Sequence, residues 1–381
     1  MRFAILLEVN VKSSRLFIPA GLVFLVAVSV NASLHAGAPE PSPGWNPKAA
    51  ASYLDGRAEW WTTWSNAQRD RGTYCMSCHT TLPYALARPA LRGLLSERAP
   101  SAAEEKIVGN LLTRARNWRD VEPWYPDQTR GIPKTSESRA IESVMNAAVL
   151  SRRDAVTGKM SDDTRTAFSV MWNLQMKTGA EAGAWTWLNF KMDPWESPNS
   201  PYFGASIAAI AVGSAPEGYA ASPEIADRVK ALRDYFQRQH ANVSLLNQLM
   251  GLWASSQIPD LLTAEQRKAT IDAALALQQP DGGWNTTAIG SYKRSDNSQS
   301  DMRTDGFATA LATLALQSAG VPPTDPRLAK GLDWLRRNQD PASGRWTAVS
   351  PNKERDPKTE QSKFMSDAAT AYAVLSLTYQ R

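Results

Sequence analysis

Helices of two kinds alternate along this chain, and that alternation constrains the fold most. Apolar residues recur at spacings of three and four, with hardly one alternating stretch, so the sequence predicts an all-α protein. The first kind is amphipathic with one charged face, in Ala49–Asn66, Ala102–Arg119, Asp162–Lys177, Glu224–His240, Thr263–Gln279 and Arg327–Gln339. The second kind is small and apolar nearly all round, in Thr81–Leu95, Ser138–Leu150, Tyr202–Val212, Leu245–Ser255, Gly306–Ala319 and Asp367–Tyr379.

The second kind of helix has no polar face to give to water, so it must be buried on every side. We therefore place it in an inner layer and the amphipathic kind in an outer one. Six such pairs, each of about 55 residues, predict a repeat architecture whose units cannot bury their apolar faces alone.

The joints between paired helices carry a second pattern. In the last unit Gly331, Trp334, Gln339, Gly344 and Trp346 match the QW motif of squalene and hopene cyclases. Other units keep parts of it: Gln279 with Gly282, Gly283 and Trp284; Gln175 with Gly183 and Trp185; Gln68 with Gly72 and Tyr74. Glutamine can bond free carbonyls at a helix end, glycine permits the turn, and tryptophan stacks over it. We expect these residues to hold the fold.

On these motifs the chain resembles the prenyltransferase and squalene oxidase repeat family, from residue 49 to the end and most closely over residues 263–381. The resemblance implies an (α/α)6 toroid, with an inner ring of helices, an outer ring and a central cavity open at one end. The longer connections run from outer to inner helices and would meet at one end of such a toroid. We expect the functional mouth there.

Both cysteines of the chain lie in Cys75-Met76-Ser77-Cys78-His79. This is the C-x-x-C-H pattern of c-type haem attachment, in which two thiols bind one edge of the porphyrin and the imidazole binds the iron. The motif directly precedes an inner helix, so it falls at the predicted mouth. We predict one covalent haem c per chain, held by Cys75, Cys78 and His79.

Three other interpretations of this motif stay open. A disulfide across so short a loop would be strained and would close little chain. A thioredoxin-like redox pair normally lies in a βαβ unit, which the sequence does not predict, and a zinc site requires further ligands. For the sixth position on a haem iron, Met365 is the first hypothesis because the last inner helix would neighbour the first, Met302 is the second, and an open position is the third.

Cyclase and prenyltransferase chemistry find little support in the sequence. Hopene-type cyclases protonate an alkene with a D-x-D-D motif, which is absent here. Protein prenyltransferases need a zinc bound by Asp, Cys and His, and the only two cysteines of this chain already belong to the haem motif. Three acids at inner-helix starts, Asp301, Asp305 and Asp367, are weak catalytic candidates, because helix caps are their default role.

A glycan-processing toroid is a third class. The connections are rich in aromatic residues that can stack on sugars, namely Trp118, Trp124, Tyr125, Trp185, Trp187, Trp195 and Tyr202. The acids among them are Glu122, Asp127, Asp193 and Glu196.

The amino terminus has basic residues up to Arg15, an apolar run from Leu16 to Val30 and small residues to Ala38. This pattern predicts a secretory signal over residues 1–38, with an uncleaved anchor as the alternative, followed by a Pro-rich linker over 39–48 and one toroid over 49–381. The formal net charge of +5 is too small for a nucleic-acid footprint.

Together these features predict an exported, periplasmic or secreted haem protein with a redox or ligand-binding role at the cavity mouth. Its partner would be a periplasmic redox protein or a hydrophobic small molecule, with membrane contact only through an uncleaved amino terminus. The alternatives are an enzyme or binder for an isoprenoid in the cavity, and a glycan-processing or haem-free toroid.

Overall fold

A computed structural model describes residues 44–379 of the chain. The predicted signal over residues 1–38 and the first part of the Pro-rich linker lie outside the described residues. Within residues 44–379 the structure is helical, with isolated bridges and no extended strand. None of the described helices is both long and apolar enough to cross a bilayer.

Twelve of the described helices form two sets that match the predicted alternation. The outer set is α1 (Pro47–Thr63), α3 (Ala102–Arg116), α6 (Asp162–Asn173), α8 (Ala226–Gln239), α10 (Ala264–Ala276) and α13 (Pro326–Arg337). The inner set is α2 (Thr81–Leu94), α5 (Lys134–Ala155), α7 (Ser200–Ser214), α9 (Leu245–Ala254), α12 (Gly306–Ser318) and α14 (Phe364–Leu377). Two short helices, α4 (Asp127–Arg130) and α11 (Thr286–Gly290), lie in connections.

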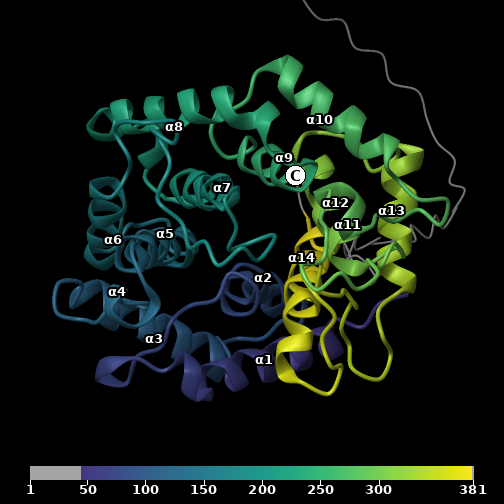
Figure 1. The fold of residues 1–381 in the computed structure, drawn as a ribbon, viewed down its shortest axis with the longest axis horizontal. Helices are drawn as coiled ribbons and strands as arrows, with labels where there is room; N and C mark the ends of the chain where they lie inside the picture. The colour runs from purple at the N-terminus through teal and green to yellow at the C-terminus, as the bar shows by residue number, and fades with distance from the viewer. Residues whose placement is uncertain (1–43, 380–381) are drawn as a thin grey trace, which may run out of the picture. The chain divides into compact units, whose positions relative to one another are not determined.

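The inner helices form a closed ring. Each packs against the next one along the chain, and α14 packs against α2, so the last pair meets the first (Figure 1). Every residue of α12 is buried. The outer helices pack on this ring with one apolar face, which confirms the predicted (α/α)6 toroid.

Three joints share one tryptophan contact. The indole N–H of Trp185, Trp284 and Trp346 donates to a carbonyl near the end of the preceding outer helix, at 2.7, 2.6 and 2.8 Å respectively. All three side chains are fully buried. These tryptophans therefore close the free end of an outer helix and seal the joint against water.

A glutamine in the same joints links one repeat to the next. The Gln339 amide donates to Gly344 O at 2.8 Å and to Asn46 O, just before α1, at 3.0 Å. Gln175 does the same with Gly183 and Arg228. In the fifth unit Gln278, not the predicted Gln279, bridges Gly282 and Arg327. Gln279 itself donates to Leu277 O at the end of α10 at 3.2 Å, as expected of a glutamine at a helix end.

The glycines of these joints lie directly against the next outer helix. Gly344 has a φ of +78°, and a Cβ there would lie 2.4 Å from the Ala49 carbonyl of α1. Gly183 and Gly282 have φ near +100° and face α8 and α13 in the same way. Both the backbone conformation and the close approach therefore require glycine.

The first joint departs from this pattern. Tyr74 stands in place of tryptophan, and its hydroxyl donates to Lys106 O of α3 at 3.1 Å. Its backbone N–H and carbonyl are both bound by the Asn110 side chain. The segment that leads into the cysteine motif is thus fixed to the second repeat.

Candidate functional site

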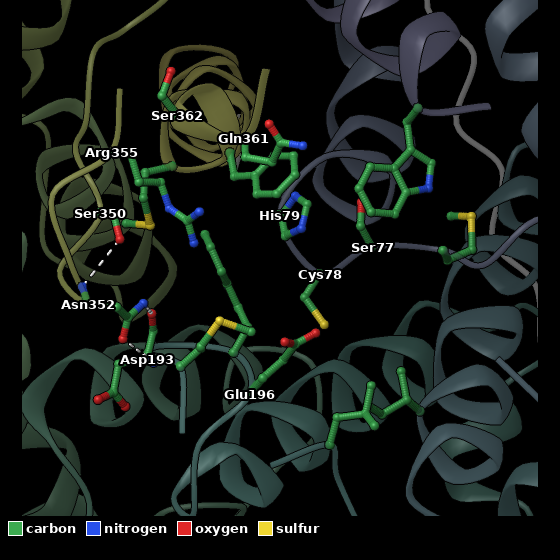
Figure 2. A pocket seen from close by; sticks show the side chains of 18 of the residues that line it. Ser77, Cys78, His79, Asp193, Glu196, Ser350, Asn352, Arg355, Gln361 and Ser362 are labelled. Carbon is green, nitrogen blue, oxygen red and sulfur yellow. Dashed lines mark hydrogen bonds between the residues drawn. The ribbon is translucent and has the colours of Figure 1, made fainter. Parts of the chain in front are cut away.

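A cavity of about 230 Å³ lies among the outer-to-inner connections, at the end of the toroid where the mouth is expected. Its lining comes from the first, second, third and sixth of these connections and includes Ser77, Cys78 and His79 (Figure 2). Six aromatic side chains form most of its apolar wall: Trp61, Trp64, Trp124, Tyr125, Trp195 and Phe364.

Local hydrogen bonds fix the cysteine motif at the start of α2. The Trp61 indole donates to Cys75 O at 2.7 Å. The Ser77 hydroxyl accepts from the backbone N–H groups of Thr80 and Thr81 at 3.1 and 3.0 Å. Ser77 therefore fixes the turn that leads into α2, and in this turn Cys78 and His79 line the cavity.

The His79 ring has a defined tautomer. Its Nδ1 lies 2.9 Å from Thr80 Oγ1, and the Thr80 hydroxyl donates to Asp367 Oδ2 at 2.7 Å. Because that hydroxyl proton is committed to Asp367, Thr80 Oγ1 accepts from Nδ1–H. The Nε2 atom then carries the lone pair, and it has no hydrogen-bond partner among the described residues. An imidazole bound in this way is arranged as a metal ligand usually is.

Packing holds the same ring in place. Phe364 stacks on His79 with ring centroids 3.8 Å apart, and Trp61 meets its edge at 5.1 Å. Burial, with Arg57 and Arg355 nearby, lowers the pKa of His79 to about 3. The imidazole is therefore neutral at physiological pH, which is the form that binds a metal.

Both cysteines are free thiols. Burial raises the pKa of Cys75 to about 11 and that of Cys78 well above its ordinary value. Cys78 lines the cavity, whereas Cys75 is buried and does not belong to the lining. The structure thus places Cys78 and His79 together at one wall of the cavity. Cys75, three residues before Cys78, does not line it.

The residues present fit a covalent haem in their chemistry. Two unpaired thiols, a neutral imidazole with a free Nε2 and an aromatic wall are the groups that such a cofactor requires. Cys75 and Cys78 would hold such a haem through thioethers, each by addition of S–H across a vinyl C=C bond with no oxidant consumed, and His79 would bind its iron.

The two candidate methionines lie in different places. Met365, the second residue of α14, is buried and lines the same cavity as His79. Met302 is 59% exposed and lines a separate hollow on the neighbouring connections. Met76 and Met192, which the sequence did not single out, also line the cavity.

Each of the three candidate acids is engaged by donors. Asp305 caps α12 through Phe307 N and Ala308 N, and burial raises its pKa to about 6. Asp301 is paired with Arg303, which lowers the pKa of Asp301. Asp367 is paired with Arg57 at 2.8 Å, and burial raises its pKa. None of the three lines the cavity.

Two of the acids from the glycan interpretation do line it, Asp193 and Glu196. Burial raises the pKa of Glu196 to about 7 and that of Asp193 above its ordinary value. Glu196 can therefore take up or release a proton near neutral pH. Of the seven aromatic residues named with them, Trp124, Tyr125 and Trp195 line the cavity.

Arg355 is a cavity residue that sequence reasoning missed. It lies in the long connection before α14 and faces the cavity from the side opposite Cys78 (Figure 2). The polar residues around it in the sequence would predict a solvent-exposed side chain, as for other arginines in loops. Its place becomes evident only when the sixth connection folds over the mouth.

Within residues 44–379, no group of three or more histidine, cysteine, aspartate or glutamate side chains is placed to hold a metal ion.

Comparison with known proteins agrees with the fold. Residues 245–378 match the family model of the squalene-hopene cyclase C-terminal domain. A variant of an alpha-1,6-mannanase from Salegentibacter sp. HEL1_6, solved with alpha-1,6-mannotriose, superimposes with a TM-score of 0.52 at 10% identity, covering 87% of this chain and 100% of that one. The unaltered mannanase gives a TM-score of 0.50 at 11% identity, with the same coverage.

A type II terpene cyclase, MstE from Scytonema, aligns with a TM-score of 0.43 at 13% identity, over 87% of this chain and 99% of that one. No curated protein sequence matched the chain. Residues 245–378, from α9 to α14, are therefore similar to the squalene-hopene cyclase C-terminal domain, and the chain as a whole has the α/α toroid fold.

Proposed function

We propose that the protein is an exported c-type haem protein, with one haem attached at Cys75 and Cys78 and bound through His79 Nε2. The observation that carries this proposal is the His79 ring itself: Nδ1 is bound by the Thr80–Asp367 chain, and Nε2 is free at the wall of an aromatic cavity. A haem at this position would supply one-electron transfer, or ligand binding at an open iron position.

Met365 is the proposed second axial ligand. It lines the cavity that His79 lines, and it follows Phe364, which stacks on the imidazole. A His/Met iron would favour electron transfer, and an open position would favour ligand sensing or peroxide chemistry. We expect Met365→Ala to change the absorption spectrum of the oxidised protein. An unchanged spectrum would remove Met365 from the ligand set.

The first experiment is an absorption spectrum of the full chain from a host that matures c-type cytochromes, oxidised and reduced, repeated after denaturation and acid extraction. We expect colour that stays with the polypeptide. Cys75→Ala with Cys78→Ala should give a protein without covalent haem, and Ser65→Ala, at an exposed position outside the cavity lining, serves as the control. A colourless wild-type protein from a competent host would refute the proposal.

Export is part of the same proposal, because covalent haem attachment takes place outside the bacterial cytoplasm. The N-terminal pattern described above supports it. We expect the mature protein in the periplasmic fraction, beginning near Pro39. Intact mass and N-terminal sequencing check this, and a mature chain that still begins at Met1 would favour the anchor.

The second candidate function is binding or conversion of a hydrophobic, isoprenoid-like molecule. The aromatic wall of the cavity and the match of residues 245–378 to a cyclase domain favour it. It predicts a lipid that copurifies with a colourless protein, found by organic extraction and mass spectrometry. The mannanase likeness supports the fold alone, at 10% identity.

A further inference from the structure

Arg355 is a half-buried cation without a counter-charge. Among the described residues its guanidinium has no ion pair or hydrogen bond, and burial lowers its pKa. The buried arginines Arg57, Arg88 and Arg114 are each paired with a carboxylate, whereas the partly exposed Arg152 and Arg355 have no ion pair among the described residues, and of these two only Arg355 lines the cavity. A guanidinium that loses water without gaining a partner is costly, so an unpaired one at a cavity wall points to an anion from outside the chain.

The surroundings of Arg355 are positive. It stands between the aromatic cavity and a second hollow of about 810 Å³, and it lines both. The cations that line this cationic hollow are Arg294, Arg303, Arg345, Lys353, Arg355 and Lys363, against the acids Asp301 and Glu354. Two of these cations, Arg294 and Arg345, each have a buried Nε–H without a partner. The field at this end of the cavity therefore attracts negative charge.

The acids on the cavity wall do not neutralise the positive charge of Arg355. Glu196 and Asp193 line the cavity but form no ion pair with Arg355. Figure 2 shows the Cys78 sulfur and the Arg355 guanidinium on different sides of the cavity. Cys78 and Arg355 thus lie on different sides of a cavity whose wall includes several aromatic side chains.

We propose that Arg355 binds the carboxylate of an amphipathic ligand whose apolar body fills the aromatic cavity. The inference deepens the proposed function, because haem is such a ligand: its carboxylates lie on the edge opposite the vinyl groups that the cysteines bind. A free acid with a long apolar chain has the same combination of a carboxylate and an apolar body. Haem and such a free acid are distinguished by whether the purified protein is coloured.

In the haem-loaded protein the readout is the reduction potential. A guanidinium near the carboxylates disfavours the more positive oxidised state, so Arg355→Gln should lower the potential while the axial-ligand bands stay unchanged. Arg355→Lys should restore most of it. Lys353→Gln is the matched control, since this exposed cation lines the hollow but not the cavity. Equal potentials for wild type, Arg355→Gln and Lys353→Gln would overturn the inference while leaving the haem proposal intact.

If the wild-type protein is colourless, the haem proposal fails and the free acid is tested directly. Oleate and oleyl alcohol then serve as probes in equilibrium binding. Arg355→Gln should weaken oleate binding about tenfold, the loss of one charge-assisted hydrogen bond, and leave oleyl alcohol unchanged. Equal affinity of the wild type and the variant for oleate would overturn the inference.

Discussion

At the residue scale, the state of His79 depends on Thr80, whose own hydrogen-bond partner lies 287 positions away. Thr80 is its neighbour in sequence, but Asp367, which fixes the Thr80 hydroxyl, belongs to the last inner helix. Asp367 was a candidate acid from its place at a helix start. In the structure it accepts from Arg57, Tyr53 and Thr80, so it serves as a positioning residue for the imidazole.

Thr80→Val tests this chain of hydrogen bonds. The variant keeps the shape of the side chain but removes the acceptor for Nδ1–H, so the His79 ring loses its fixed tautomer. Changes of this kind in the partners of metal ligands lower metal affinity or activity by roughly 10–100-fold. In a protein that carries the proposed haem, we expect Thr80→Val to alter the axial-ligand bands and to speed ligand exchange at the iron, with Thr80→Ser as the conservative control. Identical spectra for Val and Ser variants would show that Thr80 does not position the ring.

His240 provides a pH-dependent term in stability. Tyr202 donates to its Nδ1 at 2.6 Å, and its Nε2–H donates to Thr270 Oγ1 at 2.7 Å, because the Thr270 hydroxyl is used on Gln266 O. Burial lowers the pKa of His240 to about 4, below the value of about 6.5 in an unfolded chain. Between these values the unfolded state binds a proton that the native state does not.

Stability from His240 is therefore complete above pH 6.5 and falls as the pH drops toward 4. We expect the free energy of unfolding to fall by about 2 kcal/mol more in the wild type than in His240→Gln between pH 7 and pH 5. Urea unfolding of both proteins at both pH values measures this difference. If the free energy of unfolding fell by the same amount in the wild type and in His240→Gln, His240 would not be a source of the pH dependence, since all other titrating groups are common to both proteins.

At the element scale, the spacing of apolar residues predicted all twelve helices of the two rings. A helix that is apolar on every side and an amphipathic helix differ in how their apolar residues are spaced along the sequence. The ends were less predictable. The fifth helix, α5, runs from Lys134 to Ala155, beyond the predicted Ser138–Leu150, since its last turn is charged and leaves the apolar pattern. The site was predicted only in part. The local motif located Cys78 and His79, whereas Arg355, Phe364 and Thr80–Asp367 depend on contacts between distant repeats.

The glutamine bridges between repeats are a second element-scale feature, and Gln339 is the one that joins the last joint to α1. Its side chain bonds three backbone groups, namely Asn46 N, Asn46 O and Gly344 O. We expect Gln339→Leu to lower the free energy of unfolding by about 1–3 kcal/mol, because those groups lose their partner. Gln299→Leu, at an exposed loop position, should change it by less than about 0.5 kcal/mol. Denaturant titration compares the two, and equal effects would refute the bridge as a stabilising contact.

At the scale of the whole molecule, the toroid differs from an open repeat array because its ends meet. In an open array terminal repeats are capped, and a shortened array still folds. Here α14 packs against both α12 and α2, and Arg57 of α1 is paired with Asp367 of α14. Closure also builds the candidate site, since Phe364, Met365 and Asp367 all come from α14 while His79 precedes α2. Ring and site are thus completed by the same contacts.

Deletion of residues 364–381 tests closure. The shortened chain would expose apolar faces of α2 and α12 and leave Arg57 without Asp367, so we expect loss of cooperative thermal unfolding for the whole domain and rapid proteolysis. A circular permutant that joins residue 379 to residue 44 by a flexible linker, and opens at 95–101 between α2 and α3, keeps every ring contact and should melt cooperatively. Circular dichroism melts and limited proteolysis separate the two. A deletion variant that still melts in one sharp transition would mean that each repeat pair is stabilised by its neighbours on one side alone, as in an open solenoid, and that closure serves the site rather than the fold.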